Sequence, residues 1–429
     1  MTISARGAFM AMLVLTTICS ILSALMFALA FYQIIYIIVS LFGKPKRFPD
    51  GKPNRFAVLI AARNEANVIS QLIESIKKQD YPAELVDVYV VADNCTDNTA
   101  EIAKNCGATV FERFNQEKVG KGYALNYLLG NLKTLHPFNY YNGYIVIDAD
   151  NILDKSFITE INKVFSAGYK VVTSYRNSKN YDVNWKSSGS ALMMLRESLH
   201  LNNARMILGQ SSTISGTGFV VASELIEKMD GWNKFQLTED IEFSLECVSN
   251  GEKIGYAYDA KLYDEQPVTF SQLWNQRIRW ARGYILAYVK YFKALCRSMF
   301  KGKLKFSSYD MIMNNIPVIM LGTVCTILGI VALIIGISTS QITPLQTLIA
   351  FAVMLANGYL SGVVFGALIG INAWREIRCS NWKKIKSFLV FPFMVLIIFV
   401  AAVAALFVKV KWKPIKHSAV KSIDEFDNK

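Results

Sequence analysis

The residues that could do chemistry are acidic side chains at the ends of apolar runs. Asp148-Ala149-Asp150 directly follows the run 144-YIVI. Two carboxylates spaced two apart at the carboxyl end of a strand can ligate Mg²⁺ or Mn²⁺, and such an ion neutralises phosphate oxygens and helps a nucleoside diphosphate to leave. A short acidic turn after a strand is also common, so the tripeptide alone leaves both interpretations open.

Two further carboxylates close other apolar runs. Asp93 ends 86-VDVYVVAD, and Glu65 ends 57-AVLIAARNE. At the same edge of a sheet, either side chain could accept hydrogen bonds from a base or a ribose. An Asx turn that caps the next helix would also explain Asp93, although Asp97 suits that role better, and helix capping would explain Glu65.

A lysine and an acidic tripeptide stand before two later helices. In 119-VGKGYALN, Lys121 lies between two glycines, which would bring a cation and a helix N-terminus near a diphosphate. The full Walker spacing is lacking, so a solvated turn lysine is the alternative. In Thr238-Glu239-Asp240, Asp240 could be the general base for an acceptor hydroxyl, whereas helix capping with acidic charge in the first turn would explain the same residues.

The segment 274-WNQRIRWARGY combines an amide, arginines and aromatic rings on one predicted helix. Gln276 and Arg279 are three residues apart and share a face. An arginine suits bidentate phosphate binding, and the indole of Trp280 suits stacking on a sugar ring. A basic amphipathic helix on anionic lipid, with Arg277 and Arg282 in the headgroup region, would give the same pattern, and both can hold at once.

The elements that must position these residues alternate between strand and helix patterns. Strands are predicted at 57-AVLIAARNE, 86-VDVYVVAD, 109-TVFER, 144-YIVIDAD and 170-KVVTSY, and helices at Val68–Lys78, Asn98–Asn105, Gly122–Leu132 and Phe157–Phe165. Nearly continuous apolar strands separated by amphipathic helices predict an α/β domain whose mostly parallel sheet is covered on both faces. This is a nucleotide-binding architecture in its general form.

Long apolar runs flank this domain and predict a membrane protein. The chain of 429 residues is 52% hydrophobic, and its run from Phe9 to Phe42 carries no charge, which indicates a retained anchor. As one helix this run would be roughly 50 Å long and exceed the ~30 Å hydrocarbon core, so it must tilt and protrude or fold back. Further apolar runs cover about Ile312–Ile337, Leu345–Ile371 and Phe388–Val408.

The net charge of +13 is better explained by membrane flanks than by nucleic acid, because the basic residues sit beside the apolar runs. The seven cysteines form no CxxC pair, so neither a zinc site nor a disulfide framework is indicated. The same charges place the domain, the 375-REIRCSNWKKIK loop and the tail after Lys409 on the cytoplasmic side. A full crossing by Phe388–Val408 would put the tail outside, so we expect part of that segment to re-enter or to lie in the interface.

The order Asp93, DAD, TED, QRIRW and membrane spans resembles the processive family 2 glycosyltransferases, which include cellulose, hyaluronan, chitin, poly-N-acetylglucosamine and mixed-linkage glucan synthases. The resemblance covers roughly Arg55 to Arg282 and implies a GT-A fold. The domains expected from it are a membrane anchor at 1–43, a GT-A catalytic domain at 55–270, interface helices with QxxRW at 271–305, two transmembrane helices at 308–372, and an interface loop, last membrane segment and tail at 373–429.

The resemblance also implies roles for the motif residues. Asp93 and Glu65 would contact uridine, Asp150 with Asp148 would hold Mg²⁺ or Mn²⁺, and Lys121 would lie at the diphosphate. Asp240, within Thr238-Glu239-Asp240, would be the catalytic base. Gln276 and Arg279 would bind the leaving diphosphate, and Trp280 the acceptor end. The segment 412-WKPIKH stands where hyaluronan synthases have a gating motif, so Trp412 and Lys416 would swing over the nucleotide.

The implied activity is inverting, processive synthesis of a β-glycan in the plasma membrane, with a UDP-sugar donor and a growing polysaccharide acceptor. UDP-glucose and a β-glucan are the first choice, because 263-YDEQP and the short tail look like the Gram-positive mixed-linkage group. A poly-N-acetylglucosamine synthase and a non-processive transferase that forms a glycolipid are the alternatives. A receptor that keeps the fold without catalysis would be expected to lack an acidic motif, and a transporter would be expected to carry ionisable residues in its spans.

Overall fold

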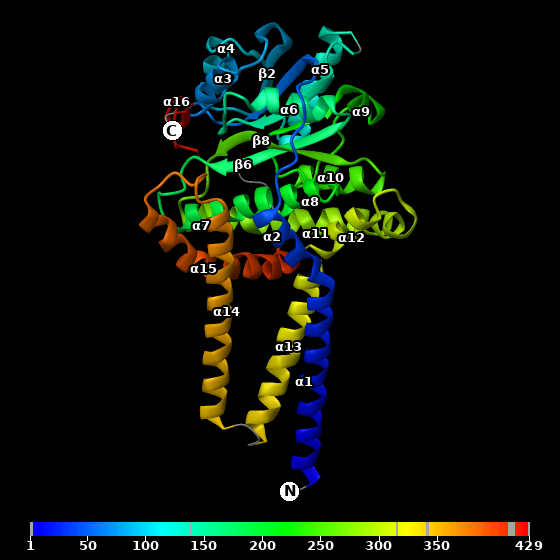
Figure 1. Cartoon of the computed structure of the whole chain (residues 1–429), viewed down its shortest axis with the longest axis vertical. Coiled ribbons are helices and arrows are strands. Elements are labelled where there is room, and N and C mark those ends of the chain that lie inside the picture. Colours follow the sequence, from blue (N-terminus) through cyan, green and yellow to red (C-terminus); the bar gives the residue numbers. More distant parts are fainter. Residues whose placement is uncertain (1–2, 138, 315, 340–342, 411–416, 428–429) are drawn as a thin grey trace.

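The computed structural model describes residues 3–137, 139–314, 316–339, 343–410 and 417–427. An α/β domain lies above a group of long helices (Figure 1). The sheet is in the upper part of the domain, and long helices extend from the lower side of the domain (Figure 1). This arrangement confirms the predicted α/β domain joined to long apolar helices.

One eight-stranded sheet forms the centre of the domain, in the order β3-β2-β1-β4-β7-β6-β8-β5. The pairs β3–β2, β2–β1 and β1–β4 are parallel, and so is the β6–β8 pair. β7 runs antiparallel between β4 and β6, and the short β5 pairs antiparallel with β8. The strands are β1 Phe56–Ala62, β2 Val86–Asp93, β3 Thr109–Arg113, β4 Gly143–Asp148, β5 Ile152–Leu153, β6 Val171–Ser178, β7 Phe219–Ala222 and β8 Ile254–Asp264.

The two faces of the sheet are buried by different helices, as the apolar strands predict. In β1, Val58 and Ile60 belong to a core that also contains residues of α3 and α6, whereas Leu59 belongs to a core with residues of α5 and α10. This alternation follows from the two-residue period of a strand. The helices of the domain are α3 Ile69–Lys77, α4 Thr99–Asn105, α5 Lys121–Leu135, α6 Phe157–Ser166, α7 Trp185–Leu195, α8 Ala204–Ile207, α9 Ser223–Lys228 and α10 Glu239–Ser249, with η1 Ala83–Leu85 and the π-helix η2 Arg196–Asn203.

The remaining helices build the membrane side: α1 Ile3–Ala30, α2 Tyr32–Phe42, α11 Phe270–Lys301, α12 Lys305–Met313, α13 Ile316–Ser338, α14 Pro344–Asn372 and α15 Asn381–Phe407, followed by α16 Asp424–Asp427. Among the described residues, four helical segments are long and apolar enough to cross a membrane. α1, α13 and α14 extend away from the domain, whereas α15 lies across its underside (Figure 1). The expectation that part of this segment re-enters or lies in the membrane interface stays a prediction, while the described part of the tail, from His417, contacts the domain.

α15 is held in this position by contacts with the domain. Met394 packs against Gly189 of α7, where an added Cβ would lie 2.9 Å from the methionine Cε. The Ser387 hydroxyl is 2.6 Å from the hydroxyl of Tyr181, and Arg282 donates to the carbonyl of Ala405 at 3.2 Å. α15 therefore packs against both α7 and α11.

The structure adds detail at two of the expected membrane boundaries. The N-terminal run, whose course the sequence left open, is divided at Phe31 into α1 and α2, and α2 packs on the domain, where Tyr36 is 1% exposed. The apolar run expected from about Ile312 includes the end of α12, a separate helix that buries Asp310 against the domain, and continues as α13 from Ile316. A buried carboxylate needs a partner, and Asp310 finds it in Arg205 at 2.7 Å.

Candidate active site

A cavity of about 400 Å³ opens at the carboxyl end of the central strands and extends down to α11 and α15. Its lining brings together residues that lie far apart in the sequence. The predicted site residues among them are Glu65, Lys121, Asp148, Asp150, Thr238, Glu239, Asp240, Gln276, Arg279 and Trp280. Asp93 is not part of the lining, and Trp412 and Lys416 lie outside the described residues.

Asp148 and Asp150 occupy the end of β4 and the turn after it. Asp148 forms an ion pair with Lys121, and its backbone N–H donates to the Thr217 hydroxyl at 2.9 Å. Asp150 is 7% exposed and accepts a bond from the backbone N–H of Glu265 at 3.0 Å. Burial opposes ionisation of Asp150, but nearby positive charge, His417 foremost, keeps its pKa below the usual value. The Asp150 carboxylate is therefore an anion at neutral pH, and both aspartates line the cavity.

Lys121 begins α5 and bridges the acidic groups. Its ammonium donates to the carbonyl of Gly216 at 2.7 Å and lies 4.0 Å from Glu239. Burial opposes its charge, yet Asp148 and Glu239 raise the pKa of Lys121 above its usual value. The backbone around the two flanking glycines explains both of them. Gly120 has a φ of +137°, which favours glycine. A Cβ on Gly122 would lie 1.8 Å from the carbonyl oxygen of Lys234, so the missing side chain leaves room for the loop that carries Lys234.

Thr238, Glu239 and Asp240 form the start of α10. Thr238 is at the N-cap position, but its side chain makes no capping hydrogen bond. Burial raises the pKa of Asp240 above its usual value, although hydrogen bonds from backbone N–H groups at the helix start and the Lys121 charge oppose the shift. A carboxylate with a raised pKa is a better proton acceptor than an ordinary aspartate at neutral pH.

The QRIRW segment lies near the start of α11, and its residues Gln276, Arg277, Arg279 and Trp280 line the same cavity. Arg279 donates to the carbonyl of Leu237 at 3.5 Å, just before the acidic tripeptide. Arg277 is 5% exposed, donates to Ser190 at 2.9 Å and lies 4.5 Å from the Trp280 ring. The alternative in which Arg277 lies among lipid headgroups is therefore wrong.

Asp93 lies at the same sheet edge but has a different partner. Its carboxylate forms a buried ion pair with Arg113 of β3, and the side chain of Asp93 is 8% exposed. Asp97, not Asp93, accepts the backbone N–H of Thr99 at the start of α4, at 3.1 Å, as expected. A role of Asp93 in uridine binding stays a prediction.

The C-terminal tail contributes a residue that sequence reasoning did not single out. His417 lines the cavity, and its Nδ1 lies 2.9 Å and 3.0 Å from the two carboxylate oxygens of Glu65. Burial opposes protonation, but Asp150 and Glu65 raise the pKa of His417 to about 10. The next two backbone N–H groups donate to Glu265 at about 3 Å. The tail thus docks beside the acidic cluster.

Arg176 and Glu265 are also part of the lining and were not predicted as site residues. Arg176 of β6 is paired with Asp264 at 2.5 Å and donates to the carbonyl of Ser215 at 2.5 Å. Arg176 lies within β6, outside any motif, whereas Glu265 directly follows β8 in 263-YDEQP, a segment noted only for its family resemblance.

Several buried polar atoms in the cavity wall have no hydrogen-bond partner among the described residues. They are Gln236 Oε1, Thr238 Oγ1, Gln276 Oε1 and Asn314 Oδ1. Buried polar atoms are usually satisfied in proteins, so such a group of exceptions is typical of a binding site. Carboxylates, basic side chains and polar atoms without a partner among the described residues therefore line the same cavity.

Comparisons with known proteins identify the domain. A family model described as "Glycosyltransferase like family 2" matches residues 53–283. A β-monoglucosyldiacylglycerol synthase from Synechocystis sp. is 25% identical over 268 residues, which are 60% of this chain and 53% of that protein. A poly-β-1,6-N-acetyl-D-glucosamine synthase from Staphylococcus aureus is 26% identical over 239 residues, 52% of this chain and 53% of that protein. The chain thus spans about half the length of these relatives.

A solved structure shares the fold. A mannosyltransferase from Pyrobaculum calidifontis, in complex with GDP-Man and Mn²⁺, superposes with a TM-score of 0.59 at 17% identity and covers 92% of this chain and 99% of its own. The family model spans more than half of the 429 residues and includes every described motif from β1 to QRIRW. The chain therefore belongs to the family 2 glycosyltransferases and carries a GT-A catalytic domain.

Proposed function

We propose that this chain is an inverting glycosyltransferase that moves a hexose from a UDP-sugar, first choice UDP-glucose, to a hydroxyl of an acceptor held at the membrane. The observation that carries the proposal is the single cavity, whose wall combines Asp148, Asp150, Asp240 and Arg279 and continues down to α15. The donor chemistry and the membrane side thus share one space. By the charge rule, the catalytic domain would face the cytoplasm, and we propose the plasma membrane as its location.

The carboxylates fit Mg²⁺ or Mn²⁺ as a partner of the donor. The described residues contain no cluster of three or more histidine, cysteine or acidic side chains suited to a metal. Mg²⁺ is commonly bound by one or two carboxylates together with water and substrate phosphates, so Asp148 and Asp150 are sufficient for such a site. An ion held there would neutralise charge on the diphosphate.

The chain's own residues would perform the transfer as follows. Asp240 accepts the proton of the acceptor hydroxyl, whose oxygen attacks the anomeric carbon of the sugar. The bond between that carbon and the phosphate oxygen breaks, and UDP leaves with the electron pair. Arg279, Gln276 and Lys121 would hold the diphosphate while negative charge develops on it. One displacement inverts the anomeric centre, and no sugar is attached to the protein.

A glycolipid is the product that the helix arrangement supports best. Nearly all side chains of residues 344–360 in α14 are exposed. Within the described residues, the outer half of α14 therefore has little protein around it, which suits a transferase that needs no enclosed path for a polymer. The similarity to β-monoglucosyldiacylglycerol synthases is in line with this product.

A processive β-glycan synthase is the second candidate. Trp280 lines the cavity within a complete QxxRW segment, and poly-β-1,6-N-acetyl-D-glucosamine synthases are among the relatives. Such an enzyme would need further helices, from partner chains, around the polymer.

The test is product analysis with the purified chain in lipid nanodiscs. Radiolabelled UDP-glucose or UDP-N-acetylglucosamine is added with Mg²⁺ or Mn²⁺, and the products are separated into solvent-extractable lipid and insoluble polymer. Label in the lipid fraction supports the first proposal, and label in a long polymer that linkage-specific glycosidases digest supports the second. Failure to release UDP from either donor, with both metals present, would refute both.

A further inference from the structure

The lower wall of the cavity carries one carboxylate that the donor chemistry leaves unused, Glu197. It lies in η2 and lines the cavity together with Met194 of α7, Tyr284 of α11 and Ala402 of α15. These neighbours belong to the membrane-side helices. Glu197 is therefore on the side from which a membrane-held acceptor would approach.

Glu197 is held in place by a buried network. The Thr213 hydroxyl donates to Glu197 Oε1 at 2.6 Å, and a guanidinium nitrogen of Arg205 lies 3.6 Å from the same oxygen. Arg205 is fully buried and is fixed by Asp310, to which it donates at 2.7 Å and 3.2 Å. The carboxylate thus has a fixed orientation.

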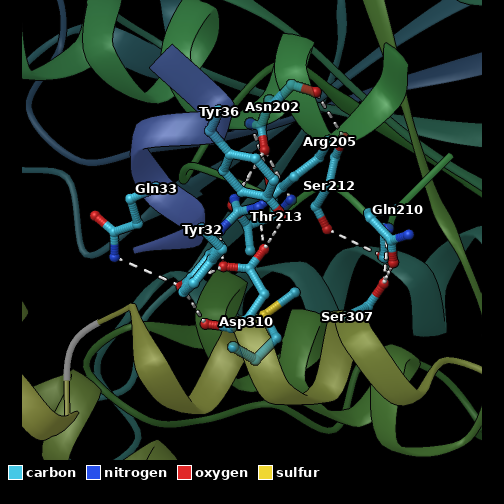
Figure 2. Close-up of polar contacts among 12 residues, drawn as sticks. Tyr32, Gln33, Tyr36, Asn202, Arg205, Gln210, Ser212, Thr213, Ser307 and Asp310 are labelled. Carbon is cyan, nitrogen blue, oxygen red and sulfur yellow. Dashed lines mark hydrogen bonds and ion pairs between the residues drawn. The ribbon is translucent and has the colours of Figure 1, made fainter. Parts of the chain in front are cut away.

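The N-terminal helix completes this network. The hydroxyls of Tyr32 and Tyr36 in α2 donate to the two oxygens of Asp310 at 2.9 Å and 3.0 Å, and both rings lie beside Asp310 and Arg205 (Figure 2). Four segments that are distant in the sequence therefore support one cavity residue. Arg205 and the tyrosines act through Glu197 and Thr213, which makes them positioning residues.

The position of Glu197 relative to Asp240 follows from the short segment 213–216. Thr213 binds Glu197, while a Cβ on Gly216 would lie 3.8 Å from Asp240 Oδ2. Three residues of chain span at most about 10 Å, so Thr213, which binds Glu197, and Gly216, which lies beside Asp240, are close to each other. Negative charge on both Glu197 and Asp240 also raises the pKa of Tyr284, after the larger effect of burial, so both carboxylates are near that ring.

The backbone that carries Glu197 is unusual. Residues Arg196–Asn203 form a π-helix of 8 residues between α7 and α8. Runs of π-helix are rare and frequently occur at functional sites, because the wider turn re-aims side chains. Here the wider turn presents Arg196 and Glu197 to the cavity.

We propose that Glu197 binds a second hydroxyl of the acceptor, next to the hydroxyl that Asp240 activates, and that the acceptor therefore ends in a sugar or a similar polyol. This inference rests on the proposed transferase function. Among the described residues, no hydrogen bond reaches Glu197 Oε2, so that oxygen is free to accept one. A diacylglycerol has a single hydroxyl, which the reaction consumes, whereas a sugar end offers several. A carboxylate facing an apolar acceptor would lose hydration without compensation.

The experiment compares two acceptors in nanodiscs with the full-length protein: an alkyl glucoside and a diacylglycerol of matched chain length. The wild type should prefer the glucoside. In Glu197→Gln, the KM for the glucoside should rise about 10- to 100-fold, because a hydrogen bond to a charged group is lost. The affinity for UDP with Mn²⁺, measured by calorimetry, and the kinetics with diacylglycerol should change far less than this.

Thr213→Val keeps the shape of Thr213 but removes the hydroxyl that holds Glu197, so it should raise the glucoside KM by a smaller factor, about 3- to 10-fold. Glu224→Gln is the matched control, because Glu224 is exposed and its one ion pair with the described residues is with Lys170 at 2.9 Å. Equal use of both acceptors by the wild type, or an equal loss on both in Glu197→Gln, would overturn the inference while the transferase function stands. A wild type that neither binds UDP nor releases it would instead refute the proposed function itself.

Discussion

Gly283 of α11 gives the sharpest prediction about the catalytic tripeptide. A Cβ added at Gly283 would lie 2.5 Å from both Oγ1 and Cγ2 of Thr238 and 2.9 Å from its Cβ. Side-chain atoms do not approach so closely, and the backbone around Thr238 must move in Gly283→Ala. Asp240 follows two residues later and would move with it.

The magnitude follows from two opposing effects on stability and one on catalysis. Alanine stabilises a helix by about 0.5–1 kcal/mol over glycine, whereas overpacking costs about 1–3 kcal/mol. The net destabilisation should lie between about zero and 2.5 kcal/mol, so the variant should fold. A displacement of about 1 Å at a reacting group costs on the order of 100-fold in rate. We therefore expect kcat/KM to fall about 10- to 100-fold.

The assay measures UDP release in nanodiscs, with thermal unfolding in parallel. Gly130→Ala is the matched control, because Gly130 also lies in a helix but nothing is within 4 Å of an added Cβ. It should keep full activity and gain about 0.5–1 kcal/mol of stability. In a Thr238→Ala background, which removes two of the three close contacts, the loss caused by Gly283→Ala should shrink. A Gly283→Ala protein with wild-type kcat/KM would refute the assignment of this loop to catalysis.

Two further predictions concern acidic groups, Asp240 and Asp150, and a third concerns His417. Asp240→Asn should abolish transfer and leave UDP binding intact; in the wild type, kcat/KM should fall as pH drops through the raised pKa of Asp240, so the acid limb should lie above the usual aspartate range near 4. Asp150→Asn should weaken the apparent affinity for Mn²⁺ on the order of 10- to 100-fold, measured by metal titration of UDP release. His417 has a folded pKa of about 10 against 6.5, so its contribution to tail docking is complete below about 6.5 and is lost as pH rises towards 10. Proteolysis of the tail should accelerate over that interval in the wild type, and His417→Ala should remove this pH dependence.

The catalytic domain could be predicted well from the sequence because its signals are local. Apolar runs such as Val86–Asp93 have the composition of buried strands, and the carboxyl ends of parallel strands meet at one edge. By this rule Asp148 and Glu65 are expected at the same sheet edge, and both line the cavity. It did not do so for Asp93, because Arg113 on the neighbouring strand binds its carboxylate.

The residues that were missed depend on contacts over long sequence distances. Glu197 stands in no motif, and within 412-WKPIKH only Trp412 and Lys416 were singled out, not His417. Both Glu197 and His417 reach the cavity because the chain folds back onto the domain. Tyr32 and Tyr36 lie within an apolar run whose composition predicts contact with lipid. Both nevertheless donate to Asp310, which is more than 270 residues away. No periodicity or composition rule reports such a pair.

An experimental structure of the protein with UDP and Mn²⁺ would show directly whether this cavity binds the donor. We predict the ion between the Asp148 and Asp150 carboxylates and the diphosphate. Arg279 and Gln276 should lie on the other side of the phosphates, and Asp240 should face the space beyond them. UDP bound away from this cavity, or an ion held without either aspartate, would refute the proposed donor site.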